Sequence, residues 1–165
     1  MIFVTAGTQE PFDRLIKVVD RIAGILNEEI IVQSLQGKHI PENVKMYDFL
    51  PPSVFDNLFD QARVVVSHAG MGTIINALTK EKPLVIIPRI AALGEHRNEH
   101  QLATTTKIKE YNYAHVVDDK DRLYDDLLFF LSNTELKPLS KTKIGEFASD
   151  SLISSIASFS LRRKR

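Results

Sequence analysis

Residues 63–88 read RVVVSHAGMGTIINALTKEKPLVIIP, and this stretch decides the fold class. Its β-branched run at 63–67 predicts a buried strand, and the glycine-containing turn at 68–73 leads into a helix that we expect to run through Lys80. A second short apolar run at 82–88 predicts the next strand. A strand, a helix and a strand in succession are typical of the βαβ units that build parallel sheets.

The same alternation continues on both sides of this stretch. We expect further strands at 1–5, 29–33, 44–49 and 113–117, and further helices at 12–26, 54–61, 95–109 and 120–131. Pro51 and Pro52 open the helix at 54–61, since proline is tolerated in a first helical turn. The sequence therefore predicts an α/β fold, a Rossmann-like parallel sheet flanked by helices.

Residues 1–131 carry this alternation and form the predicted domain. Residues 132–143 have few large apolar side chains and are interpreted as a linker. Residues 144–165 predict one more amphipathic helix, because their apolar side chains recur at helical spacing, and they end in a basic tail. Such a helix either packs back on its own sheet or docks on a partner protein or a membrane.

The composition limits the classes of protein. A chain of 165 residues with 44% hydrophobic side chains suffices for one domain. It has no cysteine, which excludes disulfides and thiolate metal sites, and its apolar runs are far shorter than the ~20 residues that span a bilayer. Residues 162–165 are all basic, and without them 17 basic side chains face 21 acidic ones. That balance argues against nucleic acid as a partner, and we expect a cytoplasmic protein.

Three loops follow strands of the predicted sheet, at 7–9, 68–73 and 89–101. In open α/β sheets, ligands bind outside the carboxyl ends of the strands. In the loop at 68–73, two glycines allow close approach of a bulky anion, Thr73 adds a hydroxyl, and the amides of the following helix start face the ligand. These features favour a binding site for a phosphate or a diphosphate, although glycines also occur in tight strand-to-helix turns that bind no ligand. The sequence has neither the Gly-Lys-Ser/Thr of a P-loop nor the full dinucleotide GxGxxG.

The strings VVSHAGMGTIINAL at 65–78 and KPLVIIP at 82–88 resemble the signature of the family 28 glycosyltransferase C-terminal domains. Glu95, Glu99 and the pair His100-Gln101 extend the likeness, and so do the opening strand and turn at 1–9. Within the family, the chain resembles the small donor-binding subunits of two-subunit UDP-sugar transferases. These are the dolichol-linked N-acetylglucosaminyltransferase and its bacterial exopolysaccharide counterparts. The resemblance covers residues 1–131.

This resemblance implies the C-terminal half of a GT-B fold. The chain would be the donor-binding subunit of a split inverting glycosyltransferase, moving a sugar from a UDP-sugar to a lipid-linked saccharide acceptor in exopolysaccharide or capsule biosynthesis. A membrane-anchored partner subunit would bind the acceptor, supply the general base and hold this chain at the inner face of the membrane. The UDP-sugar is a substrate in this scheme, and no cofactor is expected. The alternative is an activating or regulatory subunit without turnover of its own.

The resemblance also implies roles for single residues. The diphosphate or the acceptor side would be approached by Gly7, Thr8 and Gln9, and the diphosphate itself would be held by Gly70, Gly72 and Thr73. The donor sugar hydroxyls would contact His100 and Gln101. Asn76 stands where many relatives bind ribose through a carboxylate, and an amide accepts hydrogen bonds through one oxygen only. The predicted substrate site is completed by His68, Met71, Glu95 and Glu99.

Several charged residues allow two interpretations. Residues 96–100 spell H-x-x-E-H, the inverted zinc-protease pattern, but they overlap the transferase-like loop, and we expect no metal site. Asp119-Lys120-Asp121 imitates a metal-binding DxD motif, and we expect its aspartates to cap a helix instead. Glu95 is either an acid or base or a solvated loop carboxylate. The cations Arg89, Arg97 and Lys107 either neutralise a leaving UDP or are surface charges.

Overall fold

Six parallel strands form one sheet in the computed structural model, which describes residues 1–97 and 99–139. The strands are β1 (Ile2–Thr5), β2 (Ile30–Gln33), β3 (Lys45–Tyr47), β4 (Val64–His68), β5 (Leu84–Ile87) and β6 (His115–Val116). Their order across the sheet is β3-β2-β1-β4-β5-β6, with every neighbouring pair parallel. The predicted α/β fold with a Rossmann-like sheet is confirmed.

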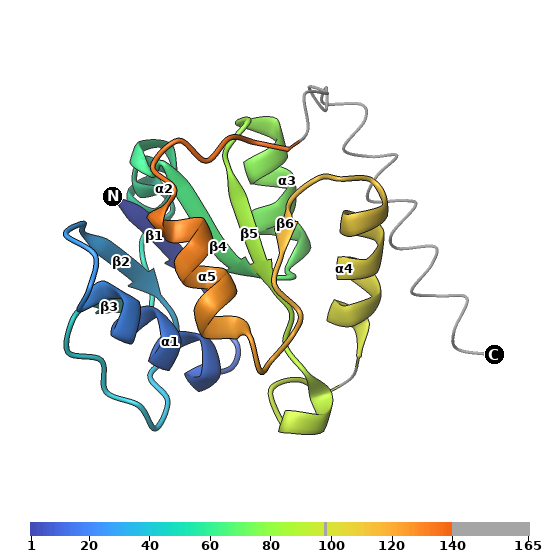
Figure 1. Cartoon of the computed structure of the whole chain (residues 1–165). Coiled ribbons are helices and arrows are strands. Elements are labelled where there is room, and N and C mark those ends of the chain that lie inside the picture. The colour runs from blue at the N-terminus through green and yellow to red at the C-terminus, as the bar shows by residue number, and fades with distance from the viewer. Residues whose placement is uncertain (98, 140–165) are drawn as a thin grey trace.

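Helices cover both faces of this sheet (Figure 1). They are α1 (Asp13–Ala23), α2 (Pro52–Gln61), α3 (Met71–Thr79), α4 (His100–Glu110) and α5 (Leu123–Ser132), with a short 3₁₀ turn, η1 (Ala91–Leu93). On one face, α1 and α5 lie side by side and share a buried core with Val4 and Val66. On the other face, α2, α3 and α4 pack on Phe3 and Val65. The strands β1, β2, β4 and β5 contribute to both cores because successive side chains point to opposite faces.

The connections diverge from the middle of the sheet. From β1 the chain runs through α1 to β2 and β3 at one edge, and from β4 it runs through α3 to β5 and β6 at the other edge. The adjacent strands β1 and β4 are therefore followed by helices on opposite faces. Such a topological switch point is where open α/β sheets bind ligands.

The helix predicted at 95–109 begins at His100 instead. Gly94 ends the turn η1 in a left-handed conformation with φ of 70°. Beyond it, the Glu95 carboxylate binds the guanidinium of Arg14 and the amide of Ile90, which fixes this part of the chain as a loop.

The predicted aspartate cap of the last helix is wrong. That helix was expected at 120–131 and begins at Leu123, with Arg122 at the N-cap position and no side chain capping it. Asp119 instead accepts the N–H of Asp121 two residues further on, at 2.9 Å. This hydrogen bond stabilises a turn that precedes α5.

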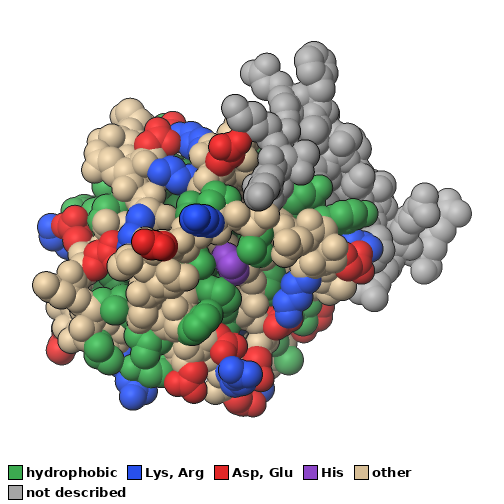
Figure 2. Space-filling model, turned by 45° about the horizontal axis from the view of Figure 1, so that its top comes forward, with side chains coloured by type: hydrophobic (Ala, Val, Ile, Leu, Met, Phe, Trp, Pro, Cys, Tyr) green, Lys and Arg blue, Asp and Glu red, His purple; other side chains and the backbone are tan. Residues whose placement is uncertain are grey.

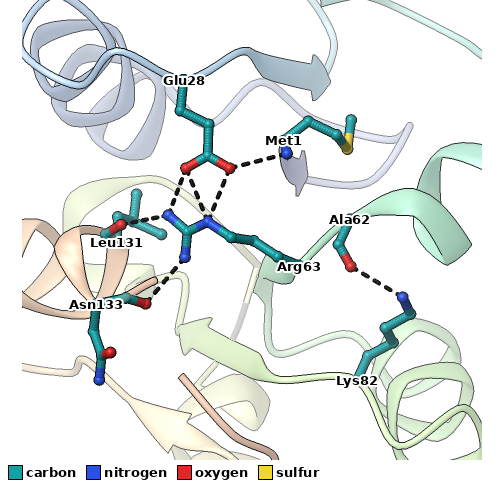
Figure 3. A network of polar contacts seen from close by, with 7 residues as sticks. All are labelled: Met1, Glu28, Ala62, Arg63, Lys82, Leu131 and Asn133. Carbon is teal, nitrogen blue, oxygen red and sulfur yellow. Dashed lines mark hydrogen bonds and ion pairs between the residues drawn. The ribbon is translucent and has the colours of Figure 1, made fainter. Parts of the chain in front are cut away.

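Arg63 anchors the amino edge of the sheet (Figure 3). Its guanidinium donates to the carboxylate of Glu28 at 2.6–2.9 Å and to the main-chain oxygens of Leu131 and Asn133 at 2.6 and 3.1 Å. Glu28 also pairs with the amino group of Met1 at 2.9 Å. Partial burial opposes the charged carboxylate, but the hydrogen bonds from Arg63 and Met1 outweigh it and lower the pKa of Glu28.

Acidic and basic side chains are interspersed over the face shown in Figure 2. That face therefore offers no extended basic surface of the kind that tracks a nucleic-acid backbone. No described helix is long and apolar enough to cross a membrane. Of the predicted linker 132–143 the structure describes residues up to 139, and the predicted helix at 144–165 lies outside the described residues.

Candidate functional site

A cleft of about 860 Å³ opens at the carboxyl ends of β1, β4 and β5. In Figure 1 this edge lies at the bottom, where the yellow-green loop after β5 is drawn. The cleft is lined by Ala6, Gly7, Thr8, Gln9, Glu10, His68, Gly70, Gly72, Thr73, Arg89, His96, Arg97 and Gln101. The three loops expected to carry the chemistry thus meet around one cavity.

Two glycines enclose the imidazole of His68. Gly7 has φ of 81°, a conformation that other residues rarely adopt, and a Cβ there would lie 3.1 Å from Cε1 of His68. A Cβ on Gly70 would lie 2.4 Å from Nε2 of the same ring. The lack of side chains at both positions therefore lets the turns after β1 and β4 close on His68.

Gly72 lies in the first turn of α3 and lines the cleft. No described atom beyond its own stretch of chain lies within 4 Å of where its Cβ would be. The N-cap residue of α3 is Gly70, and no side chain caps the helix. The first amides of α3, at the positive end of the helix dipole, are thus available to an anion in the cleft.

His68 is neutral at physiological pH. Burial, helped by the charge of Arg89, lowers its pKa to about 4. Its Nδ1 lies 3.5 Å from the main-chain oxygen of Thr5. The ring therefore brings hydrogen-bonding atoms and no positive charge to the cleft.

Arg89 is a buried cation, 3% exposed. Its guanidinium donates to the main-chain oxygens of Ala6, Glu10 and Pro11 at 2.6–2.7 Å and to that of Glu95 at 3.2 Å. These bonds tie the turn after β1 to the loop after β5. The interpretation of Arg89 as a surface charge is wrong, because four carbonyl groups hold it inside.

Gln101 and Glu95 brace the same loops. The side-chain oxygen of Gln101 accepts the N–H of Ala69 at 3.3 Å and that of Arg89 at 2.9 Å, which joins the ends of β4 and β5. Glu95 forms a nearly buried ion pair with Arg14. The interpretation of Glu95 as a solvated loop carboxylate is therefore wrong.

The structure brings together part of the predicted substrate site. The predicted residues that line the cleft are Gly7, Thr8, Gln9, His68, Gly70, Gly72, Thr73 and Gln101, and those that do not are Met71, Asn76, Glu95, Glu99 and His100. Arg89 and Arg97, which the sequence left open as cations for a leaving UDP, also line the cleft. The other three lining residues, Ala6, Glu10 and His96, were not predicted. Each adjoins a predicted motif, and this proximity was the signal that could have found them.

The H-x-x-E-H string does not form a helical pair of histidines. His96 precedes α4, whose first residue is His100, so the two histidines do not share one helix as the helix predicted at 95–109 implied. Within residues 1–97 and 99–139, no group of three His, Asp or Glu side chains is arranged to hold a metal ion.

Comparison with known proteins places the chain in a family. The model of the "Glycosyltransferase family 28 C-terminal domain" matches residues 1–153. Two relatives are named UDP-N-acetylglucosamine transferase subunit ALG13. The human protein is 30% identical over 110 residues, covering 59% of this chain and 10% of its own length. The protein of Debaryomyces hansenii is 27% identical over 78 residues, covering 47% and 36%. The chain thus matches about a tenth of the length of the human relative and about a third of the length of the Debaryomyces hansenii relative.

Solved structures share the fold. An NMR structure of ALG13 superposes with a TM-score of 0.59 at 18% identity and covers 94% of both chains. MurG of Acinetobacter baumannii superposes with a TM-score of 0.62 at 17% identity over 95% of this chain and 49% of its own. The glycotransferase of kitacinnamycin gives 0.56 at 18% identity over 95% and 38%. The match of the family model over residues 1–153 shows that the chain belongs to the glycosyltransferase family 28 C-terminal domains.

Proposed function

We propose that this chain binds a UDP-sugar in the cleft at the switch point and acts as the donor half of a two-chain inverting glycosyltransferase. The donor is UDP-N-acetylglucosamine, and the acceptor is a lipid-linked saccharide. The observation that carries the proposal is that the glycine turns after β1 and β4 and the uncapped start of α3 line one cleft.

The chemistry of the cleft suits a nucleoside diphosphate. Main-chain amides at a helix start bind phosphate oxygens without needing a side chain, and the hydrogen side chain of Gly72 leaves them accessible. Arg89 keeps a positive charge beside the cleft. The names of the two ALG13 relatives support UDP-N-acetylglucosamine as the donor and a subunit role for the chain.

A membrane-anchored partner completes the enzyme in this proposal. It binds the acceptor and supplies the general base, and it holds this chain at the cytoplasmic face of the membrane. The chain matches 49% of MurG and 38% of the kitacinnamycin glycotransferase. These shares support a role as one half of a GT-B enzyme. We assign the acceptor to exopolysaccharide or capsule assembly, which rests on the sequence resemblance alone.

Binding of UDP to the purified chain, measured by calorimetry, tests the donor site. Gly72→Leu places a side chain in open space of the cleft, so we expect a folded protein that no longer binds UDP. Gly24→Ala is the matched control, because its Cβ would make ordinary contacts at 3.5 Å at the end of α1. UDP binding that survives Gly72→Leu in a folded protein contradicts this site.

Transfer of labelled N-acetylglucosamine into lipid tests the two-chain enzyme. We expect negligible transfer by the chain alone and transfer when membranes containing its partner are added. If the membranes need this chain but Gly72→Leu supports full transfer, the chain is an activating subunit without a donor site of its own.

A further inference from the structure

Two arginines line the cleft, and their side chains differ in how firmly they are held. The guanidinium of Arg89 is buried, lies over the ring of Phe12 at 4.5 Å and donates to four main-chain oxygens. The side chain of Arg97 is 90% exposed, and its Nε forms a long ion pair at 3.9 Å with a carboxylate oxygen. Arg97 is therefore able to reorient toward a ligand, whereas Arg89 is fixed.

The partner of Arg97 is the carboxylate of Glu10. Glu10 follows β1 and Arg97 follows β5, so the pair joins two separate loops of the cleft. Among the described residues that line the cleft, Glu10 is the one carboxylate. Unpaired, it would repel a diphosphate, and an anion site therefore has to neutralise or displace it.

We propose that Arg97 is the cation that binds the diphosphate of the donor, and that Glu10 is its counter-ion before the nucleotide binds. This inference rests on the proposed function. Arg97 leaves Glu10 when the nucleotide enters and places its planar fork of donors on the phosphate oxygens. No covalent bond is made or broken in this exchange.

The exchange is physically favourable for two reasons. The pair with Glu10 is long and solvent-exposed, so breaking it costs little. A guanidinium bound to phosphate forms short, charge-assisted and often bidentate hydrogen bonds. Lys107, the third candidate cation, does not line the cleft and pairs with Glu110 in the last turn of α4.

Calorimetry with UDP and ligand-observed NMR with uridine test the assignment on the purified chain. We expect Arg97→Gln to weaken UDP binding about tenfold, which corresponds to about 1.4 kcal/mol, and to leave uridine binding unchanged. The UDP affinity of Arg97→Lys should fall between those of wild type and Arg97→Gln, since an ammonium keeps the charge but lacks the planar fork of donors of a guanidinium. Arg122→Gln is the matched control, because it removes an exposed arginine that pairs with Asp126 on α5, outside the cleft.

Glu10→Gln tests the counter-ion. We expect Glu10→Gln to bind UDP more tightly, because the Glu10 carboxylate then no longer competes with the diphosphate for Arg97. In the Arg97→Gln background the same change should give a smaller gain in affinity, because no Arg97 is left to compete for. Equal UDP affinity in Arg97→Gln and wild type overturns the assignment, as does an equal loss in Arg122→Gln or weaker binding in Glu10→Gln. In each of these cases the proposed function still holds if the wild-type chain binds UDP. A wild-type chain that binds no UDP refutes the proposed function itself.

Discussion

The carboxylate of Glu95 receives two hydrogen bonds from the guanidinium of Arg14, at 2.7 and 2.8 Å, across 81 positions of sequence. It also accepts the N–H of Ile90 at 2.9 Å. The pair fastens the loop after β5 to α1. That loop supplies His96 and Arg97 to the cleft, so the shape of the cleft depends on an ion pair that does not line it.

Removing this ion pair should destabilise the protein. We expect Glu95→Ala to lower the free energy of unfolding by about 3 kcal/mol, since it leaves a largely buried guanidinium without its partner. Glu95→Gln should cost less, because its amide oxygen can still accept the N–H of Ile90. Denaturant unfolding measures both variants. Lys45→Ala, which breaks an exposed pair with Glu29, is the control and should cost less than about 1 kcal/mol. Equal losses in all three variants would contradict the bracing role.

The contact of Gly70 with His68 predicts a coupled pair of substitutions. Gly70→Ala places a Cβ against Nε2 and should cost about 1–3 kcal/mol of unfolding free energy through overpacking. In a His68→Ala background the ring is absent, so the same change should cost less. Gly72→Ala, which meets open space, is the control. Additive losses in the double variant would show that the ring does not limit residue 70.

The sequence predicted those features that local pattern specifies. The buried strands β1, β4 and β5 each begin with at least three consecutive apolar residues. Glycines marked the turns at Gly7 and Gly70, because backbone conformation or close contact requires glycine there. The later start of α4 was missed because the Arg14 partner of Glu95 lies far away in sequence. Glu10 was missed because an exposed charge carries no periodic signal.

Acid should destabilise the fold through His68. Its pKa is about 4 in the folded chain against the usual 6.5, so the unfolded state takes up a proton first as pH falls. The contribution of the neutral ring is complete above pH 6.5 and is lost between pH 6.5 and 4, at up to about 1.4 kcal/mol per pH unit. Unfolding of wild type and His68→Gln across this range should show a shallower dependence in the variant. Parallel curves, or an NMR titration of His68 near 6.5, would contradict a buried neutral ring.

We expect sugar transfer by the assembled enzyme to continue in the presence of a chelator. The positive charge at the cleft comes from Arg89, Arg97 and the start of α3, which take the place that a divalent cation holds in metal-dependent transferases. The assay is transfer of labelled sugar with and without EDTA, with wild-type UDP binding measured under both conditions. Activity that EDTA abolishes and Mg²⁺ or Mn²⁺ restores would show a metal requirement.

Deletion of residues 140–165 should separate donor binding from partner docking. Both cores of the described chain are built from residues up to 136, and helices already cover each face of the sheet. We therefore expect the shortened chain to unfold cooperatively and to bind UDP like the full chain. Transfer with partner membranes should fall, because we propose that residues 144–165 dock at the partner and the membrane surface.

The basic tail at 162–165 allows a milder version of this test. Replacing Arg162, Arg163, Lys164 and Arg165 by glutamine keeps the length of the chain but removes up to about 1 kcal/mol of attraction per charge to an anionic surface. Sedimentation with anionic vesicles and with partner membranes measures the loss, which should shrink as salt rises. A deletion variant that unfolds would place the tail in the core, and one that still assembles fully would refute docking.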